Sequence, residues 1–202
     1  MNQYRPPLVL VTHWLTAVAV FALMISGVAI LLAHPRLYWG ETGTLGTPSL
    51  IDLPLPMVLT GQTGWGRSLH FLAAWVIVLS GVSYVAAGVP RRYFRWPDYN
   101  GLQRRTYAIV VFFLAPLAVW TGLAMSPAVE SVMPSIVTLL GGHQSARTIH
   151  FVAASLITLF VAGHIVMIAT SGFTARMRGM IVGSLDVARD RPLDSAQGRS
   201  AP

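Results

Sequence analysis

Four histidines give this 202-residue chain its most distinctive chemistry: His13, His70, His150 and His164. Each lies in or at the head of a long apolar run, whereas all seven acidic residues and all the arginines lie outside those runs. Ionisable groups in such surroundings are costly and usually functional. A neutral imidazole nitrogen is a ligand for haem iron or zinc. Cysteine is absent, which excludes thiol chemistry, iron–sulfur clusters and covalent c-type haem attachment.

The spacing of His150 and His164 separates them along one helix. Fourteen residues return to within roughly 40° of the same helical face and rise about 21 Å. Two imidazoles so far apart cannot share one metal ion. Each therefore requires a partner from another helix at its own depth.

A short string containing histidine occurs twice, as GRSLHFLAAW in the second apolar run and as ARTIHFVAAS in the fourth. Both copies place an arginine three residues before the histidine. Arg67 and Arg147 would then lie one helical turn from His70 and His150, where a guanidinium would pair with a cofactor carboxylate. The alternative is an ordinary interfacial arginine.

The composition predicts the elements that position these side chains. Apolar residues make up 54% and charged residues 10% of the chain, with a mean hydropathy of +0.61, against roughly 25% charged residues in soluble domains. Four uncharged runs are long enough to cross a bilayer as helices. We expect an all-α, integral-membrane four-helix bundle over residues 1–183, followed by a polar, disordered tail at 184–202; its spans are about 8–33, 69–89, 106–126 and 148–171. A signal peptide is the alternative for the first run, but that run is too long and lacks a cleavage site.

The net charge of +7 indicates how the chain is oriented in a membrane rather than nucleic-acid binding, because the arginines cluster in particular connections between the apolar runs. Five lie between the second and third runs, and others precede the first run or follow the fourth. The positive-inside rule places these segments in the cytoplasm. A multi-pass protein of the bacterial inner membrane is expected, with both termini cytoplasmic.

This orientation pairs the histidines by depth: His70 with His150 near the outer surface, and His13 with His164 near the inner surface. Two stacked bis-imidazole sites in an apolar bundle suit two b-type haems. Zinc is the alternative, but it requires three or four convergent ligands.

Two glycines lie on the faces that carry the first two histidines. Gly27 shares a face with His13, and Gly81 lies about 20° from the face of His70. A residue without a side chain would let a porphyrin approach the backbone at either position. Close packing between helices is the alternative.

The strings THWLTAVAVFALMISG, HPRLYWGETG and GRSLHFLAAW, with the His150/His164 pair, resemble the bacterial dihaem cytochrome b family. This group includes cytochrome b-561 and the membrane subunits of formate dehydrogenase, nickel–iron hydrogenase and thiosulfate reductase. The similarity extends to about Gly183. It implies the same histidine pairing, and electron transfer between an extracytoplasmic redox partner and membrane quinone. The YWGETG segment resembles loops found beside molybdopterin proteins, which implies such a partner.

Two other functions are consistent with parts of this pattern. One is a self-contained, quinone-linked dihaem oxidase of the superoxide oxidase type. The long external connection, residues 34–68, favours docking of a partner instead, because loops of that length are usually functional. The other is a histidine-lined transporter, which the lack of intramembrane carboxylates disfavours. As an electron-transfer subunit, the chain is expected to have no catalytic residue of its own.

Overall fold

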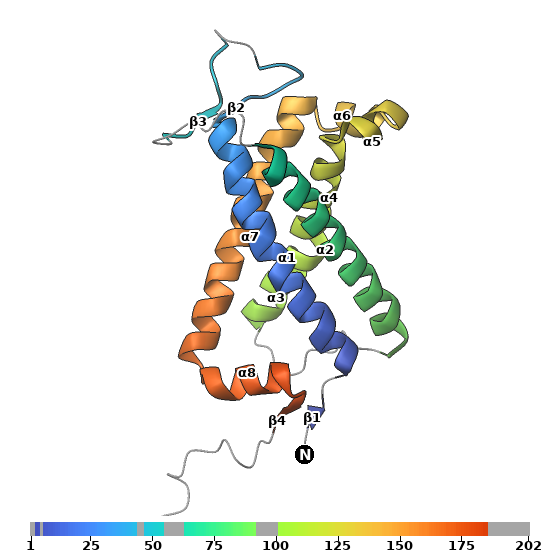
Figure 1. The fold of residues 1–202 in the computed structure, drawn as a ribbon, viewed down its shortest axis with the longest axis vertical. Helices are drawn as coiled ribbons and strands as arrows, with labels where there is room; N and C mark the ends of the chain where they lie inside the picture. Colours follow the sequence, from blue (N-terminus) through green and yellow to red (C-terminus); the bar gives the residue numbers. More distant parts are fainter. Residues whose placement is uncertain (1–2, 5, 44–46, 55–62, 92–100, 186–202) are drawn as a thin grey trace, which may run out of the picture.

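The computed structural model describes residues 3–4, 6–43, 47–54, 63–91 and 101–185, and most of them are helical. Within these residues, four helical segments are long and apolar enough to cross a membrane. They run between the two ends of the molecule (Figure 1). The predicted all-α, four-span architecture is therefore confirmed. The segments are α1 (Pro7–Ala33), α2 (Thr63–Arg91), the succession of α3 (Gly101–Ile109), η1 (Val110–Leu114) and α4 (Ala115–Ala124), and α7 (His143–Thr170).

The long helices extend beyond the apolar runs. α2 begins at Thr63 and α7 at His143, about one and a half turns before the expected spans. Polar residues at a membrane surface continue a helix because its backbone groups still bond internally. Hydropathy detects only the apolar part of each helix.

The helices pack as two pairs, α1 with α2 and α4 with α7. The doubled string supplies small residues at matching positions: Ala73 and Ala153 are both buried. In the first copy, a Cβ on Gly66 would lie 3.4 Å from that of Ala29 on α1. Its counterpart Ala146 is fully buried. Small residues allow membrane helices to approach closely, so the repeat is also a packing motif.

A π-helical turn interrupts the third span at η1. Pro116 follows it, and proline lacks an N–H and crowds the carbonyl four residues earlier. Instead of a regular α-helical bond, the N–H of Ala115 bonds the carbonyl of Val110, five residues back. The wider turn separates Tyr107 on α3 from Thr121 on α4.

The end of the bundle that the arginine distribution predicts to face outward, called the outer end from this point on, carries a small hairpin and two short helices. β2 (Arg36–Leu37) and β3 (Ile51–Asp52) pair antiparallel, and Arg36 forms an ion pair with Asp52 at 3.2 Å. α5 (Pro127–Val132) and α6 (Ser135–Thr138) lie between the third span and α7.

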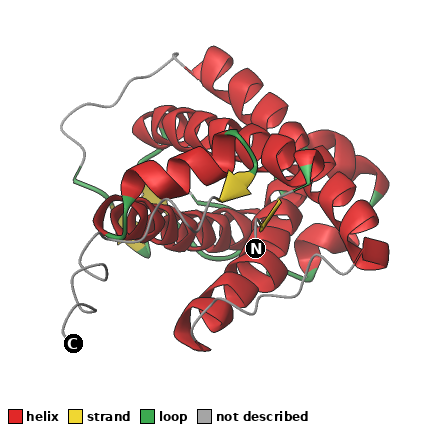
Figure 2. Cartoon of the chain, turned by 90° about the horizontal axis from the view of Figure 1, so that it is seen from below, coloured by secondary structure: helices red, strands yellow, loops and turns green. Residues whose placement is uncertain are grey.

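At the opposite end, α8 (Phe173–Ile181) lies across the bundle (Figure 2). β1 (Gln3–Tyr4) pairs with β4 (Ser184–Leu185), which places the N- and C-terminal segments at one end, as the arginine distribution requires. The expected polar tail lies, from residue 186, outside the described residues.

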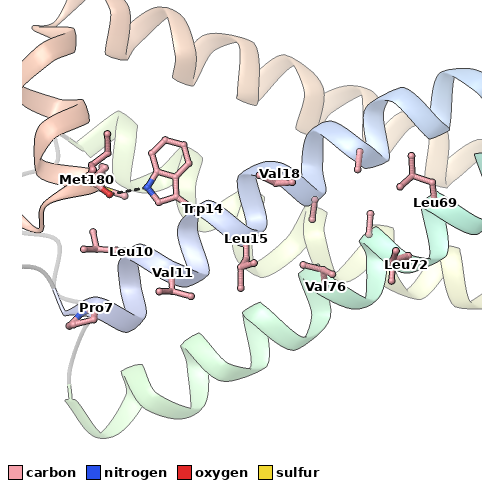
Figure 3. A pocket seen from close by; sticks show the side chains of 14 residues that line it. Pro7, Leu10, Val11, Trp14, Leu15, Val18, Leu69, Leu72, Val76 and Met180 are labelled. Atoms are coloured by element: carbon pink, nitrogen blue, oxygen red, sulfur yellow. Dashed lines mark hydrogen bonds between the residues drawn. The ribbon is translucent and has the colours of Figure 1, made fainter.

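An apolar groove of about 750 Å³ runs along α1 and α2 to α8. Figure 3 shows Trp14 at the α8 end, where its indole N–H donates to the carbonyl of Met180 at 2.9 Å. Val18 and Val76 line the groove nearer the middle of the two helices. The groove therefore reaches from the α8 end toward the middle of the bundle.

Candidate functional site

His70 on α2 and His150 on α7 lie beside each other at the outer end of the bundle. Their ring centroids are 6.1 Å apart, and the ring planes make an angle of 62°. A metal–imidazole nitrogen bond is about 2 Å and a ring nitrogen lies about 1 Å from its ring centre, so two imidazoles on opposite sides of one ion have centres about 6 Å apart. The pair thus has the separation that one iron between two imidazoles requires. No group of three or more histidine or carboxylate side chains suited to a metal ion occurs in the described parts of the chain.

Two buried hydroxyls determine which nitrogen of each ring is available. Ser26 Oγ lies 2.9 Å from His70 Nδ1, and Thr121 Oγ1 lies 2.9 Å from His150 Nδ1. Each hydroxyl also donates its proton to a carbonyl four residues earlier in its own helix, at 2.7 Å. Its oxygen must therefore accept the Nδ1 proton, which leaves the Nε2 lone pair for a metal ion.

A glycine follows each of these hydroxyl residues and faces the same ring. A Cβ on Gly27 would lie 3.7 Å from Cε1 of His70, and one on Gly122 would lie 3.5 Å from Cε1 of His150. The outer site therefore has two equivalent halves, one built by α1 and α2 and the other by α4 and α7.

Sequence reasoning identified Gly27 but missed Ser26, Thr121 and Gly122. The available signal was a hydroxyl–glycine dipeptide in the helix preceding each copy of the doubled string. Gly81 lies elsewhere: it is exposed, and a Cβ there would meet no atom within 4 Å. Its expected role beside a haem stays a prediction.

The two arginines of the doubled string differ in their surroundings. Arg67 is exposed, whereas Arg147 is partly buried and its guanidinium donates to the carbonyl of His34. A guanidinium carries five N–H donors, so this bond leaves others for a carboxylate. Pairing of either arginine with a haem propionate stays a prediction.

The inner histidines lie toward the α8 end. The ring of His13 on α1 packs edge-on against Trp14, with centroids 5.6 Å apart. His164 on α7 stacks on Phe160 at 6.0 Å and 20°, and its Nδ1 lies 2.7 Å from the hydroxyl of Tyr107. Sequence reasoning placed both histidines at this depth but did not foresee Tyr107. Their pairing on one iron stays a prediction.

The external loop after α1 is tied to the first turn of α7. The N–H of Gly40 donates to Ser145 Oγ at 2.8 Å, and the N–H of Gln144 donates to the Gly40 carbonyl at 2.9 Å. Thr148 Oγ1 donates to the carbonyl of Tyr38 at 2.6 Å. The loop is thereby held within two helical turns of His150.

Gly142, which precedes α7, permits this contact. Its φ is +106°, and a Cβ there would lie 2.6 Å from the backbone of Gly40. Between these anchors, the side chain of Trp39 is left exposed. The attached loop thus presents an aromatic side chain at the outer surface.

Comparison with known proteins identifies the family. The family model for prokaryotic cytochrome b561 matches residues 4–183. The chain belongs to the prokaryotic cytochrome b561 family. It is a multi-pass electron-transfer subunit of the bacterial inner membrane, and cytochromes of this family bind haem b. The resemblance found in the sequence is therefore confirmed.

One relative from Azospira oryzae is named a putative protein-methionine-sulfoxide reductase subunit YedZ1. The two sequences are 28% identical over an alignment of 197 positions. The alignment covers 82% of this chain and 89% of that protein. No solved structure matches the chain significantly.

The donor set at the outer site fits the cofactor of the family. Two imidazoles with oriented rings suit six-coordinate haem iron, and adjacent glycines leave room beside the rings. The absence of cysteine suits a non-covalently bound b-type haem rather than a c-type haem.

Proposed function

We propose that this cytochrome carries two b-type haems and transfers electrons between an extracytoplasmic redox protein and membrane quinone. The observation that supports this best is the apposition of His70 and His150, each with Nδ1 held by a buried hydroxyl. When bound, each haem supplies a one-electron iron couple whose potential depends on its ligands and burial.

The chain's own residues would divide into an outer and an inner set. His70 and His150 hold the outer haem, with Arg67 and Arg147 near its propionates. Gly27 and Gly122 keep the backbone clear beside the outer ligands.

At the inner site, His13 and His164 hold the second haem, with Gly81 near its edge. The hydroxyls of Ser26, Thr121 and Tyr107 each form a hydrogen bond with Nδ1 of a ligand ring and thereby orient that ring.

The external partner would dock on the attached loop. The loop exposes Trp39 and Glu41, and its bonds to Ser145 and Gln144 fix it over the helix that carries His150. Exposed aromatic residues are typical of interface hot spots. We propose a molybdopterin oxidoreductase, from the resemblance of the YWGETG segment; the relative's name as a reductase subunit supports an oxidoreductase partner.

Quinone would approach from the lipid at the cytoplasmic half. The groove in Figure 3 is apolar and lies beside the helix that carries His13. Its position would admit an isoprenoid chain without exposing that chain to water.

Reconstitution with quinone in liposomes tests this function. The wild-type cytochrome, given its external partner from the native host, is expected to exchange electrons between partner and quinone. Trp39→Ala is expected to slow exchange with the partner at least tenfold and leave chemical reduction of the haems by dithionite unchanged, because it alters only the docking surface. Quinone reduction at full rate with superoxide and no partner would contradict the proposal in favour of a self-contained oxidase.

A further inference from the structure

Tyr107 occupies, at the inner site, the place that Thr121 occupies at the outer one. Both residues lie on the third span, fourteen positions apart (121 − 107). Each bonds one histidine of α7, and these two histidines, His150 and His164, are also fourteen apart (164 − 150). The Tyr107 hydroxyl lies 2.7 Å from His164 Nδ1. The third span therefore supplies a hydrogen-bond partner to both His150 and His164.

The ring of Tyr107 is fixed by its neighbours. It packs edge-on against Phe160, with centroids 5.2 Å apart and an angle of 87°, while Phe160 stacks on His164. The three rings form one aromatic cluster that holds the phenol oxygen beside Nδ1. The imidazole is thus oriented both by packing and by a directed hydrogen bond.

We infer that Tyr107 is a positioning residue whose hydroxyl oxygen accepts a hydrogen bond from Nδ1–H of His164, presents Nε2 to the inner iron and tunes the potential of that haem alone. This inference rests on the proposed dihaem function. An acceptor at Nδ1 makes an imidazole ligand more basic, and a more basic ligand stabilises ferric over ferrous iron. Loss of the acceptor should therefore favour reduction of the inner haem.

Redox titration of Tyr107→Phe tests the inference. The inner haem's ferrous-to-ferric ratio at a given potential is expected to rise about tenfold, equal to a midpoint increase of about 59 mV for a one-electron couple. The outer haem in the same chain is the internal control and should not shift. Thr106→Val is the matched variant, because the Thr106 hydroxyl donates only within its own helix, to the carbonyl of Leu102; neither haem should shift.

A fluorinated tyrosine at position 107 keeps the aromatic cluster intact and weakens only the oxygen acceptor. It should raise the inner potential by less than Tyr107→Phe does. If the phenylalanine variant loses the inner haem, the shift in the fluorinated variant alone tests the role of the Tyr107 oxygen. Unchanged inner potentials in the variants that retain this haem, or equal shifts of both haems, would overturn the role of Tyr107. A wild-type protein without two haems would instead refute the proposed function.

Discussion

His70 and His150 lie with their rings 6.1 Å apart, although eighty positions (150 − 70) separate them in the sequence. The two rings are supported in the same way: a hydroxyl at Nδ1 and a glycine beside Cε1, both from the helix packed against the one that carries the histidine. The doubled string is therefore part of a larger repeat. Two helical pairs, each with one copy of the string, together build one site.

Removing one outer ligand should abolish one haem only. His150→Ala is expected to reduce the haem content from two per chain to one, because the proposed inner ligands, His13 and His164, lie toward the other end of the bundle. His164→Ala should leave the outer haem instead. Haem quantification with reduced-minus-oxidised spectra measures both. His143→Ala, which removes only the surface pair with Glu130, is the control and should retain two haems.

Loss of both haems from either ligand variant, in a protein that remains folded, would contradict the pairing by depth. Circular dichroism and monodisperse elution in detergent establish that the variant is folded.

Removing the hydroxyls at the outer site should raise the outer potential. Ser26→Ala and Thr121→Val each remove an acceptor from Nδ1, so each should shift the outer haem upward by up to about 59 mV, a tenfold change in the one-electron equilibrium. For Thr121→Val the shift should be moderated, since the carbonyl of Ala118 also lies 3.1 Å from His150 Nδ1. Potentiometric titration measures the shifts. A change confined to the inner haem would be inconsistent with this assignment.

Filling the space beside His150 should exclude the outer haem. Gly122→Ala is expected to fold, because its Cβ would make ordinary van der Waals contact with the ring. Gly122→Leu should lose the outer haem, since the longer side chain enters the space beside the ligand. Gly64→Leu is the control, because a Cβ there meets no atom within 4 Å and the residue lies outside the site. Equal haem content in Gly122→Leu and wild type would show that this space is not needed.

Displacing the external loop should impair partner coupling without affecting the haems. Gly142→Ala combines a strained backbone, costing about 1–3 kcal/mol, with a Cβ 2.6 Å from the backbone of Gly40. Gly141→Ala is the matched control: its φ is also positive, at +78°, but its Cβ would lie 3.5 Å from Ser145 Oγ. The rate of electron exchange with the external partner, measured at constant haem content, should fall further in Gly142→Ala than in Gly141→Ala. Identical rates in the two variants would show that the position of the loop does not affect docking of the partner.

Much of the architecture follows directly from the sequence. Apolar runs free of charge locate the spans because a bilayer imposes length and composition on a helix. Helical spacing and arginine distribution then sort the histidines by depth, and the proximity of His70 and His150 in the structure agrees with that order.

The supporting residues could not be predicted in the same way. Ser26 and Thr121 resemble ordinary helical hydroxyls that bond their own backbone, and they do so here as well as meeting a histidine. The role of Tyr107 was still harder to predict, because the π-helical turn before Pro116 breaks the regular helical periodicity between Tyr107 and Thr121. Gly40 forms its bonds to α7 through its own backbone N–H and carbonyl, which no side-chain pattern at that position encodes.

The haem content of the purified wild-type chain tests the central claim most directly. Pyridine haemochrome analysis combined with reduced-minus-oxidised spectra should give two b-type haems per chain, each low-spin with two imidazole ligands. A folded preparation with one haem would contradict the paired sites, and a colourless one would remove the basis for electron transfer through these four histidines.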